Sequence, residues 1–317
     1  MQPARVWTLS DGHAGNLRQA AALAGALGLE AHDWQLDARM PWRLAAPRAL
    51  PGARGAFGAT FAHALAQPPR LAIGCGRQGA LATRLAGAAG ARTVQILDPR
   101  IDPHHWDLVV APGHDGLRGD NVLTLLGSLH PVDDAWLAAA HASHPALAAL
   151  PGPRTALLLG GPSRHVEFDL AAFERLAATL LPRITAEGGS LLATVSRRTP
   201  LDVLTALRAR AADLPGMCWT GPGDGANPYA GLLAWADRIV CSADSVNMLS
   251  EAGATRVPVF VAEPERVRGR PRRFIDALLA RGRVRALDAA LAPFDVEPLR
   301  ETARIAALVR ERLDLRD

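Results

Sequence analysis

Short apolar runs alternate along the chain with longer segments in which apolar residues recur every three or four positions. Runs such as Leu71–Ile73 and Thr155–Leu159 have the length of buried strands, whereas Leu170–Ala186 and Leu201–Ala211 have the apolar spacing of helices. Strands that alternate with helices in this way predict parallel sheets with helices on both faces. The predicted fold class is therefore α/β.

A break near the middle divides this pattern into two halves. The segment His130–Pro153 is rich in Ala, His and Pro, and a chain of 317 residues suits two domains of ordinary size. We place the first domain at residues 1–135 and the second at residues 151–296. Residues 297–317 predict a final helix with an apolar stripe, which can cross back to brace the first domain.

Composition excludes several classes of protein. The chain has no lysine, so all 35 basic residues are Arg, and neither a Schiff base, a pyridoxal phosphate anchor nor a P-loop lysine can occur. A net charge of +4 with 5% aromatic residues does not favour nucleic acid as a partner. No apolar run reaches the ~18 residues of a membrane span, and Met1–Arg5 leads directly into an apolar strand without a signal segment. We therefore expect a cytoplasmic protein, and the heavy use of Arg and Ala suggests a bacterial one.

Polar and glycine-rich segments follow the predicted strands of the first half. Ligands of open α/β sheets bind outside the carboxyl ends of the strands, so these segments are the candidate site. They supply Asp11, Gly12, His13 and Gly15 after the first strand, Gly76, Arg77 and Gln78 after the third, and His114 beside Asp115 later. Asp11 is the first candidate for a general base, with His13 and His114 as alternatives. The simpler interpretation of the first segment is a helix entry turn capped by Ser10 or Asp11.

The second half has its own polar segments after its strands. They supply Gly160, Gly161, Ser196, Arg197, Arg198, Asn227 and Tyr229. Adjacent arginines before Thr-Pro at a helix start can clamp a diphosphate, although a solvated Arg pair is the alternative. Tyr229, the only Tyr in the chain, can stack on a base or sugar, or Asn227-Pro-Tyr229 is only a helix cap with a packed ring.

The segment Ala236–Ala252 carries the most specific pattern. It predicts a buried strand at Arg238–Cys241, a tight polar turn, and a helix that opens at Ser245. The start of such a helix offers free N–H groups and a positive dipole end to a phosphate, and Glu251 is placed to accept hydrogen bonds from a sugar diol. The alternative is a plain strand–helix unit with a capped helix. The nucleotide-binding candidates here are Asp244, Ser245, Asn247, Met248 and Glu251.

Taken in chain order, these motifs resemble one known family. They are Ser10-Asp-Gly12, Gly74–Gln78, Gln95–Arg100, Ser196–Pro200, Asn227–Tyr229 and Asp244–Glu251. Over nearly its whole length the chain resembles the mitochondrial fission ELM-type family, which is similar to glycosyltransferases of GT-B architecture. The resemblance implies two Rossmann-like domains facing across a cleft, with the acceptor on the first-domain glycine loop and a nucleotide sugar in the second domain. It also implies that Ser245 faces phosphate and Glu251 faces ribose.

The expected function is an inverting, metal-independent glycosyltransferase that uses a nucleotide-diphosphate sugar. We expect no tightly bound cofactor and no metal, and a bacterial acceptor such as an envelope lipid or glycan. The alternative is a GT-B-like scaffold without activity that works through protein partners. An NAD-type epimerase is disfavoured, because its Tyr-x-x-x-Lys pair needs a lysine and we identify no G-x-G-x-x-G fingerprint, which the Ser10–Gly15 loop does not match. The arginine-rich Arg266–Arg273 is interpreted as a basic loop, or as one that reaches an anionic donor or a membrane, which leaves peripheral contact with the inner membrane open.

Overall fold

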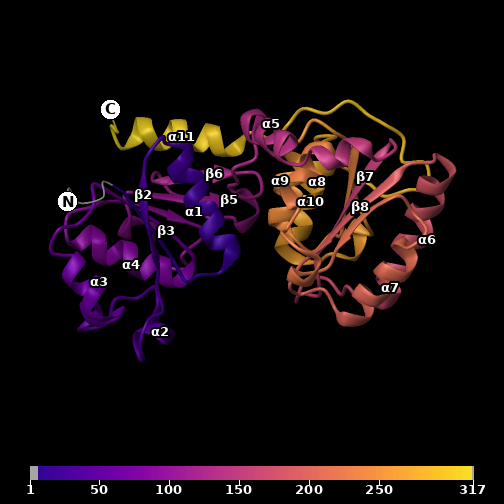
Figure 1. Cartoon of the computed structure of the whole chain (residues 1–317). Helices are drawn as coiled ribbons and strands as arrows, with labels where there is room; N and C mark the ends of the chain where they lie inside the picture. The colour runs from indigo at the N-terminus through magenta and orange to yellow at the C-terminus, as the bar shows by residue number, and fades with distance from the viewer. Residues whose placement is uncertain (1–5, 316–317) are drawn as a thin grey trace. The chain divides into compact units, whose positions relative to one another are not determined.

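The computed structural model describes residues 6–315. The chain divides into two compact units, with boundaries between Pro131 and Val132 and between Leu299 and Arg300. The first unit contains the N-terminal part and the C-terminal helix, and the second contains everything between them (Figure 1). Residues 136–150, which we had left between the predicted domains, belong to the second unit, and so do residues 132–135, which we had placed in the first domain. The expectation drawn from Met1–Arg5 lies outside the described residues.

The first unit is built on a parallel sheet. Its strands are β1 (Val6–Ser10), β2 (Ala31–Gln35), β3 (Leu71–Cys75), β4 (Arg92–Ile96), β5 (Leu108–Pro112) and β6 (Val122–Leu125). Their order in the sheet is β2-β1-β3-β4-β5-β6, and every neighbouring pair is parallel. All six strands therefore end at the same edge of the sheet.

Helices cover both faces of this sheet. They are α1 (Ala14–Ala26), α2 (Trp42–Ala45), α3 (Gly58–Ala64), α4 (Gly76–Ala88) and α11 (Glu301–Arg312). Leu23 of α1 and Ile305 of α11 belong to the same buried cluster as Val6 and Ile73 of the strands. On the opposite face, Phe61 of α3 packs in a separate cluster with residues of β1 and α4. The predicted layering of a parallel sheet between helices is confirmed in this unit.

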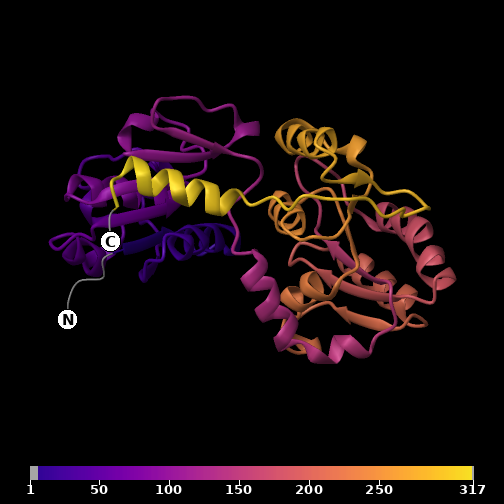
Figure 2. The same ribbon diagram turned by 90° about the horizontal axis from the view of Figure 1, so that it is seen from above.

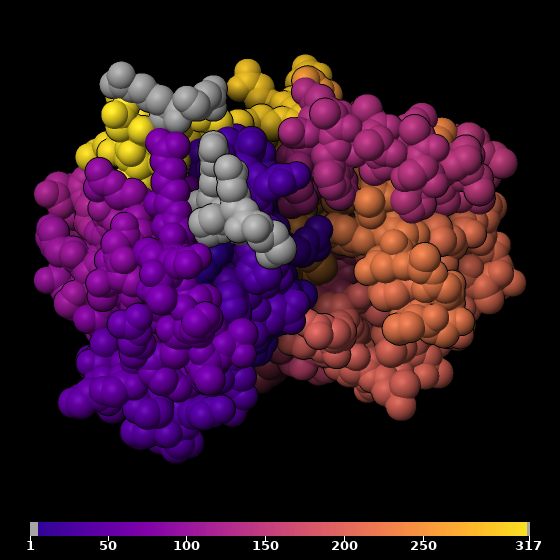
Figure 3. All heavy atoms as spheres, turned by 60° about the vertical axis from the view of Figure 1, so that its left-hand side comes forward, coloured from indigo at the N-terminus to yellow at the C-terminus, as the bar shows by residue number. Residues whose placement is uncertain are grey.

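The C-terminal helix α11 completes the first unit. Figure 2 shows it lying beside α1, and in Figure 3 its yellow atoms lie along the top of the first unit. Glu301 accepts a hydrogen bond from the backbone N–H of Leu126 at 2.8 Å, and Arg310 donates to the carbonyl of Leu27 at 3.0 Å. Its apolar face is fully buried at Ile305 and Val309. The prediction that a terminal helix crosses back to the first domain is thus confirmed.

The second unit repeats the architecture. Its strands are β7 (Arg154–Leu159), β8 (Ser190–Val195), β9 (Gly216–Trp219), β10 (Arg238–Cys241), β11 (Val259–Val261) and β12 (Arg285–Ala286). They form a second parallel sheet in the order β12-β11-β10-β7-β8-β9. Its helices are α5 (Asp134–Ser143), α6 (Leu170–Ala186), α7 (Leu201–Ala211), α8 (Tyr229–Trp235), α9 (Val246–Gly253) and α10 (Gly269–Ala280).

Each face of the second sheet has its own core. Phe173 of α6 and Val203 of α7 are buried on one face against strand residues such as Leu157. Leu232 of α8 packs in a smaller cluster with Leu192 of β8. Because helices pack on both faces of each parallel sheet, both units have the Rossmann-like arrangement of helix, sheet and helix layers.

The arginine-rich segment Arg266–Arg273 is not the loop that the sequence suggested. A short 3-10 turn, Pro264–Arg266, is followed at Gly269 by the first turn of α10. Arg266 pairs with Glu263 at 3.2 Å, and Arg272 pairs with Asp276 at 2.7 Å. Part of the positive charge is thus compensated locally. Within residues 6–315 no helix is both long enough and apolar enough to cross a membrane.

Candidate nucleotide site

Both sheets have a point at which the strand order reverses. In the second unit the chain runs from β7 outward to β8 and β9, then returns to β10 on the other side of β7. In the first unit β2 and β3 likewise flank β1. Ligands of open α/β sheets bind at such switch points, outside the carboxyl ends of the strands. The segments after β7 and β10, and those after β1 and β3, are therefore the places to inspect.

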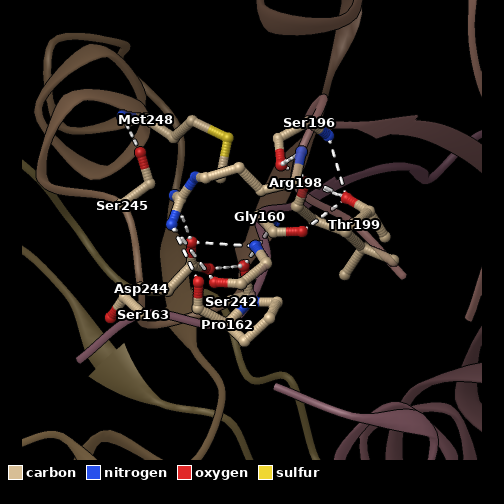
Figure 4. Close-up of polar contacts among 12 residues, drawn as sticks. Gly160, Pro162, Ser163, Ser196, Arg198, Thr199, Ser242, Asp244, Ser245 and Met248 are labelled. Carbon is tan, nitrogen blue, oxygen red and sulfur yellow. Dashed lines mark hydrogen bonds and ion pairs between the residues drawn. The ribbon is translucent and has the colours of Figure 1, made fainter. Parts of the chain in front are cut away.

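A buried carboxylate ties the segments after β7, β8 and β10 together (Figure 4). The Asp244 side chain is 1% exposed, and one oxygen accepts from the Ser242 hydroxyl at 2.6 Å. The other oxygen accepts from the backbone N–H of Gly161 at 2.9 Å and from the Arg198 guanidinium at 2.8 Å. The N–H of Gly160 donates to the Ser242 hydroxyl at 2.7 Å. We call these five residues the Asp244 knot; they fix the three segments relative to one another.

The two glycines of the knot are required by close packing. A Cβ on Gly160 would lie 2.0 Å from a carboxylate oxygen of Asp244, and one on Gly161 would lie 2.2 Å from the carbonyl oxygen of Arg198. Both distances are far below van der Waals contact. Because their N–H groups already bind Ser242 and Asp244, these glycines serve the knot itself rather than a phosphate.

The two arginines of the predicted clamp, Arg197 and Arg198, have different surroundings. Arg198 binds Asp244 and donates to the carbonyl of Pro162 at 3.2 Å, so its guanidinium is engaged. Ser196 accepts from the N–H of Arg198 at 3.1 Å, and the Thr199 hydroxyl donates to the carbonyl of Gly160. Arg197 is exposed and has no hydrogen bond or ion pair from its side chain within residues 6–315. Of the two arginines, Arg197 is the one available to a ligand.

The start of α9 offers backbone donors. The hydroxyl of Ser245 accepts from the N–H of Met248 at 3.3 Å, which is the capping interaction expected from the sequence. The N–H groups of Val246 and Asn247 donate no hydrogen bond within the described part of the chain. These two groups, at the positive end of the helix dipole, are therefore available to an anion.

Glu251 and Tyr229 are in direct contact, which the sequence did not reveal. Glu251 is 3% exposed, and one of its carboxylate oxygens accepts from the Tyr229 hydroxyl. The Asn227 side chain accepts from the N–H of Tyr229 at 3.0 Å, which forms a turn just before α8, whose N-cap residue is Pro228. Because of the Tyr229 contact, a ribose diol that reaches Glu251 has to share the carboxylate with this hydroxyl.

A pocket opens beside the knot at the ends of β10 and β11. It is lined by Val166, Glu167, Phe168, Ala172, Ser242, Ala243, Asp244, Ala262, Glu263 and Arg266. Three of these residues are acidic, and Glu263 is paired with Arg175 at 2.6 Å. Asp244 is paired with Arg198, and Arg266 of the lining also pairs with Glu263, so two of the three acidic side chains are compensated.

In the first unit, the segment after β1 is organised around Asp11. Asp11 accepts from the Asn16 side chain at 2.9 Å, and its oxygen lies 3.0 Å from Nδ1 of His13, whose side chain is 77% exposed. Partial burial alone would raise the pKa of Asp11, but the hydrogen bonds from Asn16 and His13 outweigh it and hold the pKa below its ordinary value. Burial raises the pKa of the Cys75 thiol, which donates to the side-chain amide oxygen Oδ1 of Asn16 at 3.5 Å. Asp11 is therefore a carboxylate that orients His13 rather than a strong base.

The segment after β3 contains the glycine spacing that we had not identified in the sequence. Residues 74–79 do have the G-x-G-x-x-G spacing, between a strand and a helix. A Cβ on Gly76 would lie 2.5 Å from the Asn16 amide, so a side chain occupies the place where a dinucleotide pyrophosphate approaches the second glycine. Arg77 donates to the carbonyl of Arg43 at 3.0 Å, and Gln78 accepts from the N–H of Ala38 at 2.6 Å. Through these contacts, Arg77 and Gln78 hold residues 38–44 in place.

The remaining predicted residues do not all meet at one point. Gly12 lies in the turn after β1 with φ of +78°, and Gly15 is the second residue of α1. His114 lies in a short 3-10 turn after β5. In the sheet β3 and β4 separate β5 from β1, which places the ends of those strands about 14 Å apart. His114 is therefore remote from Asp11 along the sheet edge.

The sequence-based candidate site left out three polar residues of these segments: Asn16, Thr199 and Ser242. Ser242 directly follows β10, Thr199 lies in the turn between β8 and α7, and Asn16 lies in the first turn of α1. Each hydrogen-bonds a residue distant in sequence. For Ser242 the signal available was a polar residue directly at the end of a buried strand. The described residues contain no group of three or more His, Cys, Asp or Glu side chains placed to hold a metal ion.

Solved structures with the same fold cover nearly the whole chain. MurG from Acinetobacter baumannii has a TM-score of 0.50 at 14% identity, covering 98% of this chain and 92% of MurG. A UDP-glucosyltransferase from Polygonum tinctorium has a TM-score of 0.52 at 13% identity, covering 98% and 92% of the two chains. The S. aureus MnaA–UDP co-structure has a TM-score of 0.51 at 13% identity, covering 98% of both. These similarities show a GT-B-like fold.

Sequence comparison identifies the family. The Mitochondrial fission ELM1 protein of Arabidopsis thaliana is 31% identical over 279 residues, which is 78% of this chain. The chain spans 65% of the length of that relative. The family described as Mitochondrial fission ELM1 matches residues 14–313. This chain belongs to the mitochondrial fission ELM1 family.

Proposed function

We propose that the second unit binds a nucleotide-diphosphate sugar and that the protein transfers its sugar without a metal ion. The observation that carries this proposal is the pair of free N–H groups at the start of α9, held beside the Asp244 knot at the switch point of the sheet. A diphosphate is the ligand that such a helix start, supported by an exposed Arg, favours most. The GT-B-like fold supports the same conclusion.

The chemistry assigned to the second unit is stabilisation of a leaving group. An acceptor oxygen forms a bond to the anomeric carbon of the sugar, while the bond from that carbon to the diphosphate oxygen breaks. Negative charge develops on the departing nucleoside diphosphate. We assign the stabilisation of that charge to the N–H groups of Val246 and Asn247 and to the guanidinium of Arg197, in the role that a metal ion takes elsewhere.

His13 is the candidate base for the acceptor proton. Its ring is exposed, and Asp11 holds one ring nitrogen at 3.0 Å, which orients the other nitrogen outward. Asp11 itself has a lowered pKa and makes a weak base at neutral pH. We therefore assign the proton transfer to His13 and the orienting role to Asp11, which reverses the ranking drawn from sequence.

A thermal-shift panel of UDP, GDP, ADP and CMP sugars tests this function. We expect one nucleotide class to raise the Tm of the wild type at millimolar concentration. In Arg197→Ala that shift should require about fivefold to tenfold more ligand, because a charged contact to the diphosphate is lost. Arg281→Ala is the matched control, since Arg281 is another exposed Arg of this unit without an ion pair within residues 6–315.

Two results of the panel count against the proposal. If no nucleotide shifts the Tm of the wild type, the donor site is wrong. If a nucleotide binds but incubation with bacterial lipid and glycan extracts releases no nucleoside diphosphate, the protein is a nucleotide-binding scaffold and the transfer step is wrong.

A further inference from the structure

Exposed apolar side chains gather at one place on the first unit. Four large apolar side chains are exposed in residues 6–315: Met40 at 61%, Leu44 at 71%, Leu50 at 38% and Leu201 at 78%. Three of these four lie between Met40 and Leu50, around the short helix α2, which Figure 1 shows at the lower end of the first unit. We call residues 39–54 the α2 tip.

The α2 tip is also strongly basic. Residues 38–97 contain eight Arg and no Asp or Glu. Four of the arginines belong to the tip and are exposed: Arg39, Arg43, Arg48 and Arg54. Arg43 has one acidic neighbour, Asp37 at 3.6 Å, and both side chains are largely in solvent, so that pair is weak. The other three make no ion pair in the described part of the chain.

The tip is held firmly by α4. Arg77 donates to the carbonyls of Arg43 and Leu44 at 3.0 and 3.2 Å, and Arg84 donates to the carbonyl of Pro47 at 2.8 Å. The small buried core beneath it consists of Ala46, Ala53, Ala56 and Leu81. Because this core and these hydrogen bonds fix the backbone, the exposed Met and Leu side chains are not needed to hold the tip in place.

We propose that the α2 tip docks on an anionic lipid surface. Met40, Leu44 and Leu50 enter the interfacial region, and the surrounding arginines face the lipid headgroups. Exposed aliphatic side chains interspersed with arginines, three of which have no ion pair within residues 6–315, are the composition of interfacial membrane-binding segments. A second copy of the same tip would bring four arginines against four and is disfavoured by charge. The proposal does not depend on nucleotide binding, which lies in the other unit.

Vesicle sedimentation of the full-length protein tests this surface. We expect wild type to bind vesicles that contain phosphatidylglycerol, more weakly at about 500 mM than at about 50 mM salt, because salt screens headgroup charge. Replacing both leucines (Leu44→Ser with Leu50→Ser) should weaken binding about tenfold or more, since buried apolar area is lost. Arg48→Gln with Arg54→Gln should weaken it by about fivefold for each Arg, and only on anionic vesicles.

The controls use exposed residues of the other unit. Leu201→Ser and Arg281→Gln should bind vesicles as wild type does, and every variant should keep the wild-type Tm and nucleotide response. The proposal fails if wild type does not sediment with anionic vesicles at low salt, or if the leucine pair behaves as Leu201→Ser does. It also fails if sedimentation velocity shows that the leucine pair abolishes a dimer while vesicle binding persists, because the tip is then an interface between copies.

Discussion

Replacement of His13 with Ala is expected to lower kcat for sugar transfer by about 100- to 10,000-fold, with the affinity for the nucleotide unchanged. The reason is that we propose His13 as the proton acceptor, whereas the proposed nucleotide contacts all belong to the second unit. The measurement is the rate of nucleoside diphosphate release at saturating donor, together with calorimetry of nucleotide binding. A kcat that stays within about threefold of wild type would remove His13 from the mechanism.

Two variants separate proton transfer from simple loss of a histidine. Asp11→Asn keeps the His13 ring but offers an amide to its nitrogen, so the wrong tautomer is favoured and kcat should also fall. His63→Ala changes another exposed His of the first unit and should leave kcat unaltered. If His63→Ala and His13→Ala reduce the rate equally, neither acts as the base.

Gly161→Ala is expected to lower the free energy of unfolding by about 3 kcal/mol and to weaken nucleotide binding at least about tenfold. The added Cβ would lie 2.2 Å from the carbonyl oxygen of Arg198, and that atom belongs to the backbone. Relief requires the segment after β7 or the one after β8 to move, which breaks the contact of Gly161 with Asp244. Denaturant unfolding and calorimetry measure the two effects.

Gly223→Ala is the matched control for this substitution. Gly223 lies in a short turn of the same unit, and a Cβ there would meet nothing within 4 Å. Stability and nucleotide affinity should therefore remain close to those of wild type. If Gly161→Ala behaves like Gly223→Ala, the knot is not the rigid element that its geometry indicates.

Periodicity along the chain predicted the architecture well. Strands such as Arg238–Cys241 and helices such as Leu170–Ala186 occur at the predicted residues, because their apolar spacing is set by burial on a sheet face. Helix α10 was not predicted, because arginines fill its first turn. Its apolar residues Phe274 and Leu278 are nevertheless buried at helical spacing. The spacing of apolar residues therefore predicts an element correctly wherever burial against a sheet face determines that element.

The pattern of apolar and polar residues does not predict contacts between residues that are distant in sequence. Arg197 and Arg198 are equivalent in the sequence, yet only Arg198 binds Asp244, 46 positions further along the chain. Arg77, predicted to meet a ligand, instead holds the carbonyl of Arg43. Which member of a polar pair is free depends on the segments that folding brings beside it. The sequence could therefore name the polar segments but not divide their side chains between structure and ligand.

We propose that a nucleotide binds at the carboxyl ends of β7 and β10 in the second unit, with its diphosphate at the start of α9 and its ribose at Glu251. The most direct test is calorimetry of the nucleoside diphosphate selected by the panel and of its 2′-deoxy form, against wild type and Glu251→Gln. We predict that wild type prefers the ribonucleotide by about tenfold and that Glu251→Gln loses that preference, because a carboxylate accepts the diol hydrogen bonds better than an amide. Equal discrimination by wild type and Glu251→Gln, or no binding of either nucleotide to wild type, would contradict the account.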